Sequence, residues 1–190
     1  MAAVLDLLEG TDVGLPGAMG PARTQLEVER RWVLDGEPAL GHPVLRSVDT
    51  VGITQTYLAK PSGGEPRARV RRIVAADGGV RHVWTAKRRL SSLVRVEREV
   101  EVDEVTYHDL RRRADPRRAV VEKVRRSFAY GGLRFELDHL VSPVDCWLLE
   151  VELDDLHQQV VLPPFVGAAR EVTDEVGFTN AALARRHLLA

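Results

Sequence analysis

Cysteine and lysine are scarce in this sequence, and both scarcities narrow its possible chemistry. Cysteine occurs once in 190 residues, as Cys146, which excludes an internal disulfide framework and a thiolate zinc site. Only three basic residues are lysine: Lys60, Lys87 and Lys123. Because nearly every other cation is arginine, each lysine is a candidate for an individual role.

Long apolar runs and a strong net charge are also absent. No stretch of about 18 apolar residues could span a bilayer. The first 20 residues lack the basic region that opens a secretory signal. The formal net charge of −1 provides no overall basic field for nucleic acid. We therefore expect a cytoplasmic protein, a monomer or homodimer, with no membrane or specific nucleic-acid partner.

Charged residues are abundant, at 29% of the chain, and many alternate with apolar ones. In a predicted strand at 26–34, Glu27, Glu29 and Arg31 share one face because successive strand side chains point to opposite sides. A solvated edge strand would explain one such segment. The pattern returns along the chain, however, and repeated charged faces are typical of a closed barrel with a wet interior.

The sequence predicts a mainly β (α+β) fold, an eight-stranded antiparallel β-barrel tunnel with a few flanking helices. Asp77-Gly78-Gly79 is a strong hairpin signal, and Gly131-Gly132 marks a second turn. Asp103 is a suitable helix N-cap, as is Asp174 or Thr179 for a closing helix. The predicted strands are 26–34, 53–58, 67–74, 80–87, 94–101, 119–128, 133–138 and 147–153, with helices at 103–113 and 181–189, a turn at 35–38 and a helical or irregular segment at 39–49.

The domain organisation follows from composition. Residues 1–24 contain several glycines and prolines after position 9 and are predicted to form a flexible tail, which could also dock as a short lid. Residues 25–190 are predicted to form a single domain, of a length that can bury a core.

The charged strand faces carry both signs. So many ionised groups in a narrow interior must be paired, wet or bound to ions. Carboxylates are hard oxygen ligands suited to Mg²⁺ or Mn²⁺, and arginine forks match phosphate oxygens. Together they indicate a site for a chain of phosphates. The inward candidates are Glu27, Glu29, Glu136, Asp138, Glu150 and Glu152, and Arg31, Arg69, Arg71, Lys87, Arg95, Lys123 and Arg125.

Short motifs follow one another in a fixed order through residues 25–185. They are Glu27-x-Glu29-x-Arg31, Gln55-Thr56-Tyr57-Leu58, Arg69-Val70-Arg71, Thr85-Ala86-Lys87, Arg95-Val96-Glu97-Arg98-Glu99, Glu122-Lys123-Val124-Arg125, Phe135-Glu136-Leu137-Asp138, Leu149-Glu150-Val151-Glu152, Glu171-Val172-Thr173-Asp174 and Asn180. This set resembles the CYTH superfamily, the triphosphate tunnel metalloenzymes, whose signature is Glu-x-Glu-x-Lys. The resemblance implies an eight-stranded tunnel that binds a triphosphate together with a divalent metal.

The same resemblance implies roles for individual residues. Glu97 and Glu99 are expected to hold arginines in place. Tyr57 and Lys123 match catalytic positions near the scissile phosphate. The expected Mg²⁺ or Mn²⁺ ligands are Glu27, Glu29, Asp138, Glu150 and Glu152, and the expected phosphate ligands are Arg31, Arg69, Arg71, Lys87, Arg95 and Arg125.

The expected activity is metal-dependent hydrolysis of a triphosphate, with inorganic tripolyphosphate as the first substrate to test. Thiamine triphosphate, nucleoside triphosphates and a class IV-type adenylate cyclase activity are alternatives within the superfamily. Arg31 stands where the signature has lysine: it keeps the charge but cannot act as a compact or deprotonatable group. A non-catalytic module that binds polyphosphate or nucleotide therefore remains an alternative, as does a barrel whose charges merely pair.

Overall fold

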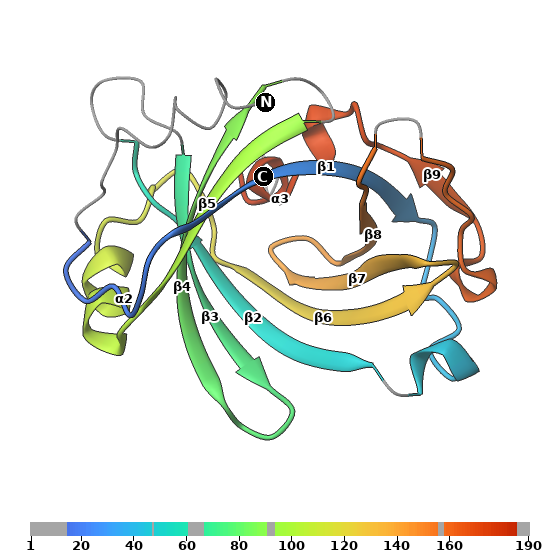
Figure 1. The fold of residues 1–190 in the computed structure, drawn as a ribbon, viewed down its shortest axis with the longest axis horizontal. Coiled ribbons are helices and arrows are strands. Elements are labelled where there is room, and N and C mark those ends of the chain that lie inside the picture. The colour runs from blue at the N-terminus through green and yellow to red at the C-terminus, as the bar shows by residue number, and fades with distance from the viewer. Residues whose placement is uncertain (1–14, 47, 61–66, 91–93, 156–157, 186–190) are drawn as a thin grey trace.

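The computed structural model describes residues 15–46, 48–60, 67–90, 94–155 and 158–185. Eight antiparallel strands form a closed barrel (Figure 1), which confirms the predicted fold class. They are β1 (Arg23–Leu34), β2 (Asp49–Tyr57), β3 (Arg67–Ala75), β4 (Val80–Arg89), β5 (Val94–Val102), β6 (Val121–Tyr130), β7 (Leu133–Ser142) and β8 (Cys146–Glu152). Their order is β5-β4-β3-β2-β6-β7-β8-β1, and pairing of β1 with β5 closes the ring.

The strand β1 closes the barrel because its two halves pair with different strands. In the first half Gln25 lies opposite Glu97 of β5, and in the second half Arg31 lies opposite Glu150 of β8. A short strand, β9 (Ala169–Glu171), adds to the end of β1. The charged face of β1 is therefore flanked by charged faces on both sides.

Glycines set the two tight hairpins that the sequence predicts. Gly78, between β3 and β4, has φ +87°, and Asp77 Oδ1 accepts a hydrogen bond from the Gly79 N–H at 2.9 Å. Gly131 and Gly132, between β6 and β7, have φ +58° and +79°. Side chains disfavour this region of backbone space, so glycine fits these positions.

Apolar residues on the outer faces of the strands form two clusters. One contains Trp32 and Trp147, and the other contains Trp84 together with the buried side chains of α2 (Glu104–Arg111). The Asp103 side chain caps α2 by accepting a hydrogen bond from a first-turn N–H at 2.7 Å, as predicted. All three tryptophans thus pack on the outside of the barrel.

A third apolar cluster lies inside one end of the barrel. It joins Leu183 of α3 (Asn180–Leu183) to Val121, Leu140 and Leu148. By strand alternation these three residues share the inward faces of β6, β7 and β8 with the charged residues. The interior is therefore apolar near α3, which Figure 1 shows within the ring of strands, and charged along the rest of its length.

The segments outside the barrel differ in detail from the prediction. β1 begins at Arg23, and residues 15–22 of the predicted tail lie along β5 and α2, where the Met19 N–H donates to the Glu101 carbonyl at 2.9 Å. Residues 1–14 lie outside the described residues. The remaining short helices are η1 (Pro43–Leu45), η2 (Pro164–Val166) and η3 (Val176–Phe178).

The closing helix is shorter than predicted, and the segment before β2 that was predicted to be helical or irregular is irregular around one short helix. The segment at 39–49 contains η1, and β2 begins at Asp49. Thr179 caps α3, one of the two predicted caps, and α3 ends at Leu183, whereas the predicted continuation at 186–189 lies outside the described residues. No helix in the described ranges is long and apolar enough to cross a membrane.

Candidate functional site

The barrel encloses a cavity of about 1280 Å³ whose wall includes charged or polar side chains from all eight strands. Alternation places these side chains inward because the opposite faces carry the outer apolar clusters. The cavity contains eleven of the predicted site residues: Glu27, Glu29, Arg31, Tyr57, Arg69, Arg71, Lys87, Arg95, Arg125, Glu150 and Glu152. The other two, Lys123 and Asp138, are not among its lining residues.

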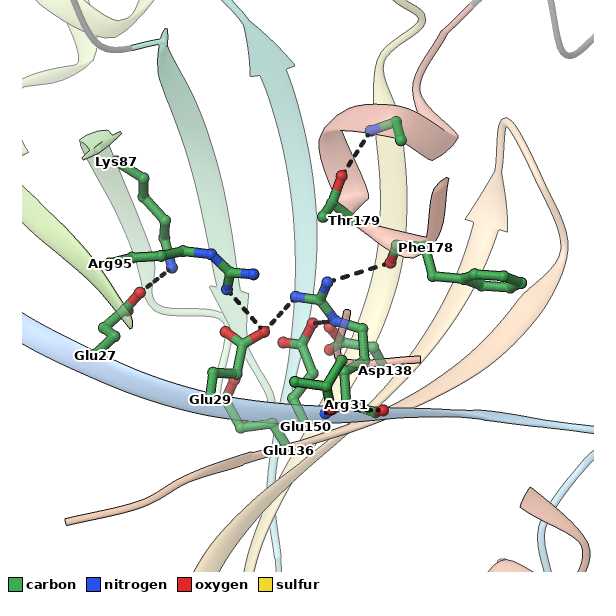
Figure 2. A network of polar contacts seen from close by, with 12 residues as sticks. Glu27, Glu29, Arg31, Lys87, Arg95, Glu136, Asp138, Glu150, Phe178 and Thr179 are labelled. Carbon is green, nitrogen blue, oxygen red and sulfur yellow. Dashed lines mark hydrogen bonds and ion pairs between the residues drawn. The ribbon is translucent and has the colours of Figure 1, made fainter. Parts of the chain in front are cut away.

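Arg31 lies at the centre of the most buried part of this wall (Figure 2). Its Nε donates to Glu150 Oε1 at 2.6 Å, and its Nη2 donates to Glu29 Oε1 at 2.5 Å. Its Nη1 donates to the Phe178 carbonyl at 3.3 Å. Burial lowers the pKa of Arg31, but Glu150 and Glu29 outweigh burial and raise it above the ordinary value. Arg31 is therefore a permanent cation held by two carboxylates.

Asp138 forms a second group, beneath the cavity lining. It is fully buried and accepts hydrogen bonds from Lys123 Nζ at 2.5 Å and from Arg125 Nε at 2.7 Å. Burial, followed by the neighbouring Arg125, lowers the pKa of Lys123 to about 8 despite the attraction of Asp138. Burial alone would raise the pKa of Asp138, but Arg125 and Lys123 lower it. Asp138 thus fixes the positions of the Lys123 and Arg125 side chains beneath the cavity lining.

Arg125 connects Asp138 to the cavity. In addition to Asp138 it pairs with Glu136, and its Nη2 lies 3.2 Å from Glu150 Oε2. Glu136 and Glu150 lie directly opposite each other on β7 and β8, where two carboxylates would repel. Arg125 relieves that repulsion by contacting both.

Lys87 forms a third group, nearer to solvent. Its Nζ lies 2.6 Å from Glu27 Oε2 and 2.7 Å from Glu97 Oε2, and its side chain is 27% exposed. Burial and the neighbouring Glu97 raise the pKa of Glu27 to about 7, although Lys87 opposes this. Lys87 therefore bridges two carboxylates that compete for one cation.

Two acidic residues of β5 hold arginines of β3, as predicted. Glu97 Oε2 lies 3.7 Å from Arg69 Nη2, and Glu99 pairs with Arg71. Burial would raise the pKa of Glu97, but Lys87 and Arg69 lower it to about 2. Burial and the neighbouring Arg69 lower the pKa of Arg71 to about 10. Both arginines present their guanidinium groups to the cavity.

Tyr57 lies where the charged interior meets the apolar cluster beside α3. Its hydroxyl accepts a hydrogen bond from Gln55 Nε2 at 2.8 Å, and the Arg118 guanidinium lies 5.4 Å from its ring centroid. Burial raises the pKa of Tyr57. The neutral phenol is therefore the stable form, and it can serve as a hydrogen-bond donor in the cavity.

The carboxylates at the edge formed by β1 and β8 are those that fit a divalent cation. Glu152 lies directly opposite Glu29, so two like charges face each other. Within the part of the chain that the structure describes, the Glu152 side chain makes no hydrogen bond or ion pair. Oxygen donors in such a position suit Mg²⁺ or Mn²⁺. No three His, Cys, Asp or Glu side chains among the described residues form a group placed to hold a metal ion, so the carboxylates at this edge would supply only part of an ion's coordination.

Sequence reasoning did not assign several cavity residues a role. Thr179 and Asn180 line the cavity beside α3, and the Asn180 side chain is buried with its Oδ1 unpaired. Arg23 and Arg134 also line it. Alternation along β1 could have identified Arg23, whereas the position of Asn180 depends on the packing of α3.

The arrangement suits an anion with several charges accompanied by a cation. Basic side chains from six strands line one cavity. Several of them, such as Lys87, Arg95 and Arg125, are neutralised by carboxylates that could instead bind a metal. A phosphate chain and a divalent ion would together satisfy both sets. A neutral ligand would satisfy neither of them.

Comparisons with known proteins give a structural likeness. No protein-family model and no curated protein matches the chain. Two crystal structures of NE1496, one described as that of an inorganic triphosphatase, are 29% and 28% identical, each with a TM-score of 0.53 over 83% of this chain and 97% of theirs. PH1819 from Pyrococcus horikoshii OT3 has a TM-score of 0.52 at 19% identity, over 68% of this chain and 78% of its own, and shows the fold alone.

Proposed function

The chain has the eight-stranded tunnel fold of the CYTH superfamily, and on this premise we propose that it hydrolyses a terminal phosphoanhydride of a triphosphate. Inorganic tripolyphosphate is the proposed substrate, with Mg²⁺ or Mn²⁺ as cofactor. One observation carries the proposal: a cavity inside the barrel lined by Arg69, Arg71, Lys87, Arg95 and Arg125, each beside a carboxylate. The likeness to NE1496, described as an inorganic triphosphatase, supports it.

The arginines bind and orient the phosphates. Arg69 and Arg71 lie two residues apart on β3, so their forks point into the cavity from one strand. Arg125 approaches from β6, and Asp138 fixes its position with hydrogen bonds from Arg125 Nε and Nη2, both of 2.7 Å. A phosphate chain held between β3 and β6 has little freedom to rotate, which favours reaction of one terminal phosphorus.

In the proposed reaction, water attacks the terminal phosphorus and the bond from that phosphorus to the bridging oxygen breaks. The products are phosphate and, from tripolyphosphate, pyrophosphate. The basic side chains stabilise the negative charge that develops on the leaving oxygen. Glu29 and Glu152 would hold the divalent ion, which neutralises phosphate oxygens and acidifies water when bound.

Tyr57 and Lys123 have supporting parts in this scheme. The Tyr57 hydroxyl reaches the cavity and can donate a hydrogen bond to a phosphate oxygen. Lys123 lies beneath the lining, so its ammonium acts on the cavity through Asp138 and Arg125. We therefore assign Lys123 to positioning and electrostatics, and Tyr57 to direct contact with substrate.

A non-catalytic polyphosphate-binding module is the second candidate. The observation that favours it is Arg31, because all three guanidinium nitrogens already have acceptors and this side chain cannot lose a proton. Such a protein would bind tripolyphosphate without releasing phosphate. Turnover separates the two candidates.

The test is a hydrolysis panel with the purified protein. Tripolyphosphate, thiamine triphosphate, ATP and pyrophosphate are each incubated with Mg²⁺, Mn²⁺ or chelator while phosphate, pyrophosphate and cyclic AMP are measured. We expect chelator-sensitive phosphate release, fastest from tripolyphosphate. Cyclic AMP production would instead indicate a cyclase, and binding of tripolyphosphate without any product would indicate a binding module.

A further inference from the structure

Glu29 and Glu150 both accept hydrogen bonds from the guanidinium of Arg31, so the cation between them is a side chain of the protein. They lie on neighbouring strands, and Arg31, directly opposite Glu150 in the register, sits between them (Figure 2). Every nitrogen of the Arg31 guanidinium has an acceptor, two of them carboxylates and the third the Phe178 carbonyl. The two acidic side chains are therefore already neutralised without a metal.

Because the three side chains are buried, the Arg31 guanidinium is hard to displace from its place between Glu29 and Glu150. Arg31, Glu29 and Glu150 are exposed by only 6%, 8% and 6%. Separating a buried ion pair leaves charges without partners in a poorly solvated place, which is strongly unfavourable. Arginine also keeps its proton under all physiological conditions, so it cannot withdraw as a neutral group in the way that lysine can.

The carboxylates of Glu152 and Glu27 are held less firmly than those of Glu29 and Glu150. Glu152 is exposed and has no partner among the described residues, although it faces Glu29 across the β1–β8 pairing. Glu27 depends on Lys87, whose ammonium is partly exposed and shared with Glu97. A divalent ion that enters the cavity therefore meets available oxygen atoms at this outer edge and a fixed cation further in.

We propose that the Arg31 guanidinium takes the place of a divalent ion between Glu29 and Glu150, and that it thereby confines metal binding to the outer edge, between Glu29 and Glu152. Arg31 is then a residue that sets the number and place of bound ions and not a phosphate ligand. The inference rests on the metal dependence of the proposed function.

The test measures Mn²⁺ binding by isothermal titration calorimetry in the absence of substrate. Wild-type protein is compared with Arg31→Met, which removes the charge but keeps an unbranched side chain. The matched control is Arg30→Met, one residue away on the outer face, where the guanidinium pairs with Glu171 at 2.6 Å. Glu152→Gln tests the outer edge.

We expect one ion per wild-type chain and per Arg30→Met chain. Arg31→Met should bind one additional ion, with an affinity at least about tenfold higher than that of any second, weak event in the wild type, since the neighbours of metal ligands change affinity by this order. Glu152→Gln should lose the wild-type ion. Circular dichroism checks that each variant is folded.

Arg31→Lys is measured in parallel, so that a misfolded Arg31→Met does not leave the question open. Its ammonium has fewer donors than the guanidinium, which contacts Glu29, Glu150 and the Phe178 carbonyl together, and we expect a gain in Mn²⁺ binding here also. Folded variants that bind the same number of ions as the wild type, with the same affinity, overturn the inference. Failure of the proposed function shows separately, as absence of phosphate release by the wild type.

Discussion

Glu29 is a side chain at which two cations of the cavity meet. It accepts hydrogen bonds from Arg31 at 2.5 Å and from Arg95 at 3.1 Å, and it faces Glu152 across the strand pairing. Its charge therefore orients two arginines and attracts a divalent ion. A change at Glu29 that keeps its shape isolates the contribution of that charge.

Glu29→Gln should lower metal-dependent kcat/KM by about 10- to 100-fold, because a neutral amide binds a hard cation poorly. Phosphate release at several Mg²⁺ concentrations measures the effect, and a higher Mg²⁺ requirement should accompany the loss. Glu122→Gln, on the exposed outer face of β6, is the control and should leave turnover unchanged. Unaltered activity of Glu29→Gln would remove Glu29 from the metal site.

Cys146 is the one cysteine, and its surroundings make it unreactive. It packs beside the apolar cluster around α3, and burial raises the pKa of its thiol to about 11. Only the thiolate reacts with maleimide or disulfide reagents, and the raised pKa delays its formation to higher pH. The side chain can therefore report on the packing of α3.

We predict that Cys146 in the folded protein reacts with a thiol reagent at about pH 8 roughly 100-fold more slowly than in the unfolded chain, since its pKa lies about two units above the ordinary value. The rate should continue to rise as the pH approaches 11. With a disulfide reagent, the absorbance of the released leaving group measures this rate. Equal rates in the folded and unfolded chains would contradict the burial of this thiol.

At the scale of elements, α3 determines how far the charged interior extends. Four residues are too few to form a stable helix alone, so packing must hold α3 in place. Leu183 supplies that packing inside the barrel, against Val121 and Leu148. Thr179 and Asn180, at the start of α3, line the adjoining end of the charged cavity.

Leu183→Ala should destabilise the protein by about 2–4 kcal/mol, because it leaves a void among buried apolar side chains. Urea unfolding measures the free energy of unfolding, and Cys146 should react faster with thiol reagents in this variant. Val176→Ala, at a residue that is 55% exposed in η3, is the control. A loss no greater than that of the control would contradict the packing of α3 inside the barrel.

At the scale of the whole molecule, the charges of the cavity are balanced within the wall itself. The basic side chains that would bind phosphate are neutralised by neighbouring carboxylates, as in the Lys87–Glu27 and Arg71–Glu99 pairs. Substrate and metal must bind together to replace these pairs without leaving either sign unpaired. Binding of one should therefore strengthen binding of the other.

Tripolyphosphate with Mg²⁺ should raise the melting temperature by roughly 5–10 °C at a concentration about 100 times Kd, since a ligand that binds only the folded state stabilises it. Tripolyphosphate with chelator should raise it much less. Differential scanning fluorimetry measures the shift, and sulfate at equal ionic strength is the control. No shift under any condition would mean that the charges of the barrel pair with one another and bind nothing.

Sequence alternation determined the strands and the faces of the charged residues, because a period of two is a local property of an extended chain. Glu27, Glu29 and Arg31 were assigned to one face in this way, and they line the cavity. The cap at Asp103 and the glycine turns were likewise predictable, since each depends on a few neighbouring residues.

Only the tertiary structure determined how deeply each charged side chain is buried and which groups it pairs with. Alternation assigns Lys123 and Arg125 to the same face, yet Arg125 reaches the cavity and Lys123 lies beneath it with Asp138. The enclosure of Arg31 by Glu150 and the Phe178 carbonyl depends on segments that lie 119 and 147 residues away from it in the sequence. Strand register and barrel closure bring these segments together, and no local pattern in the sequence encodes that distance.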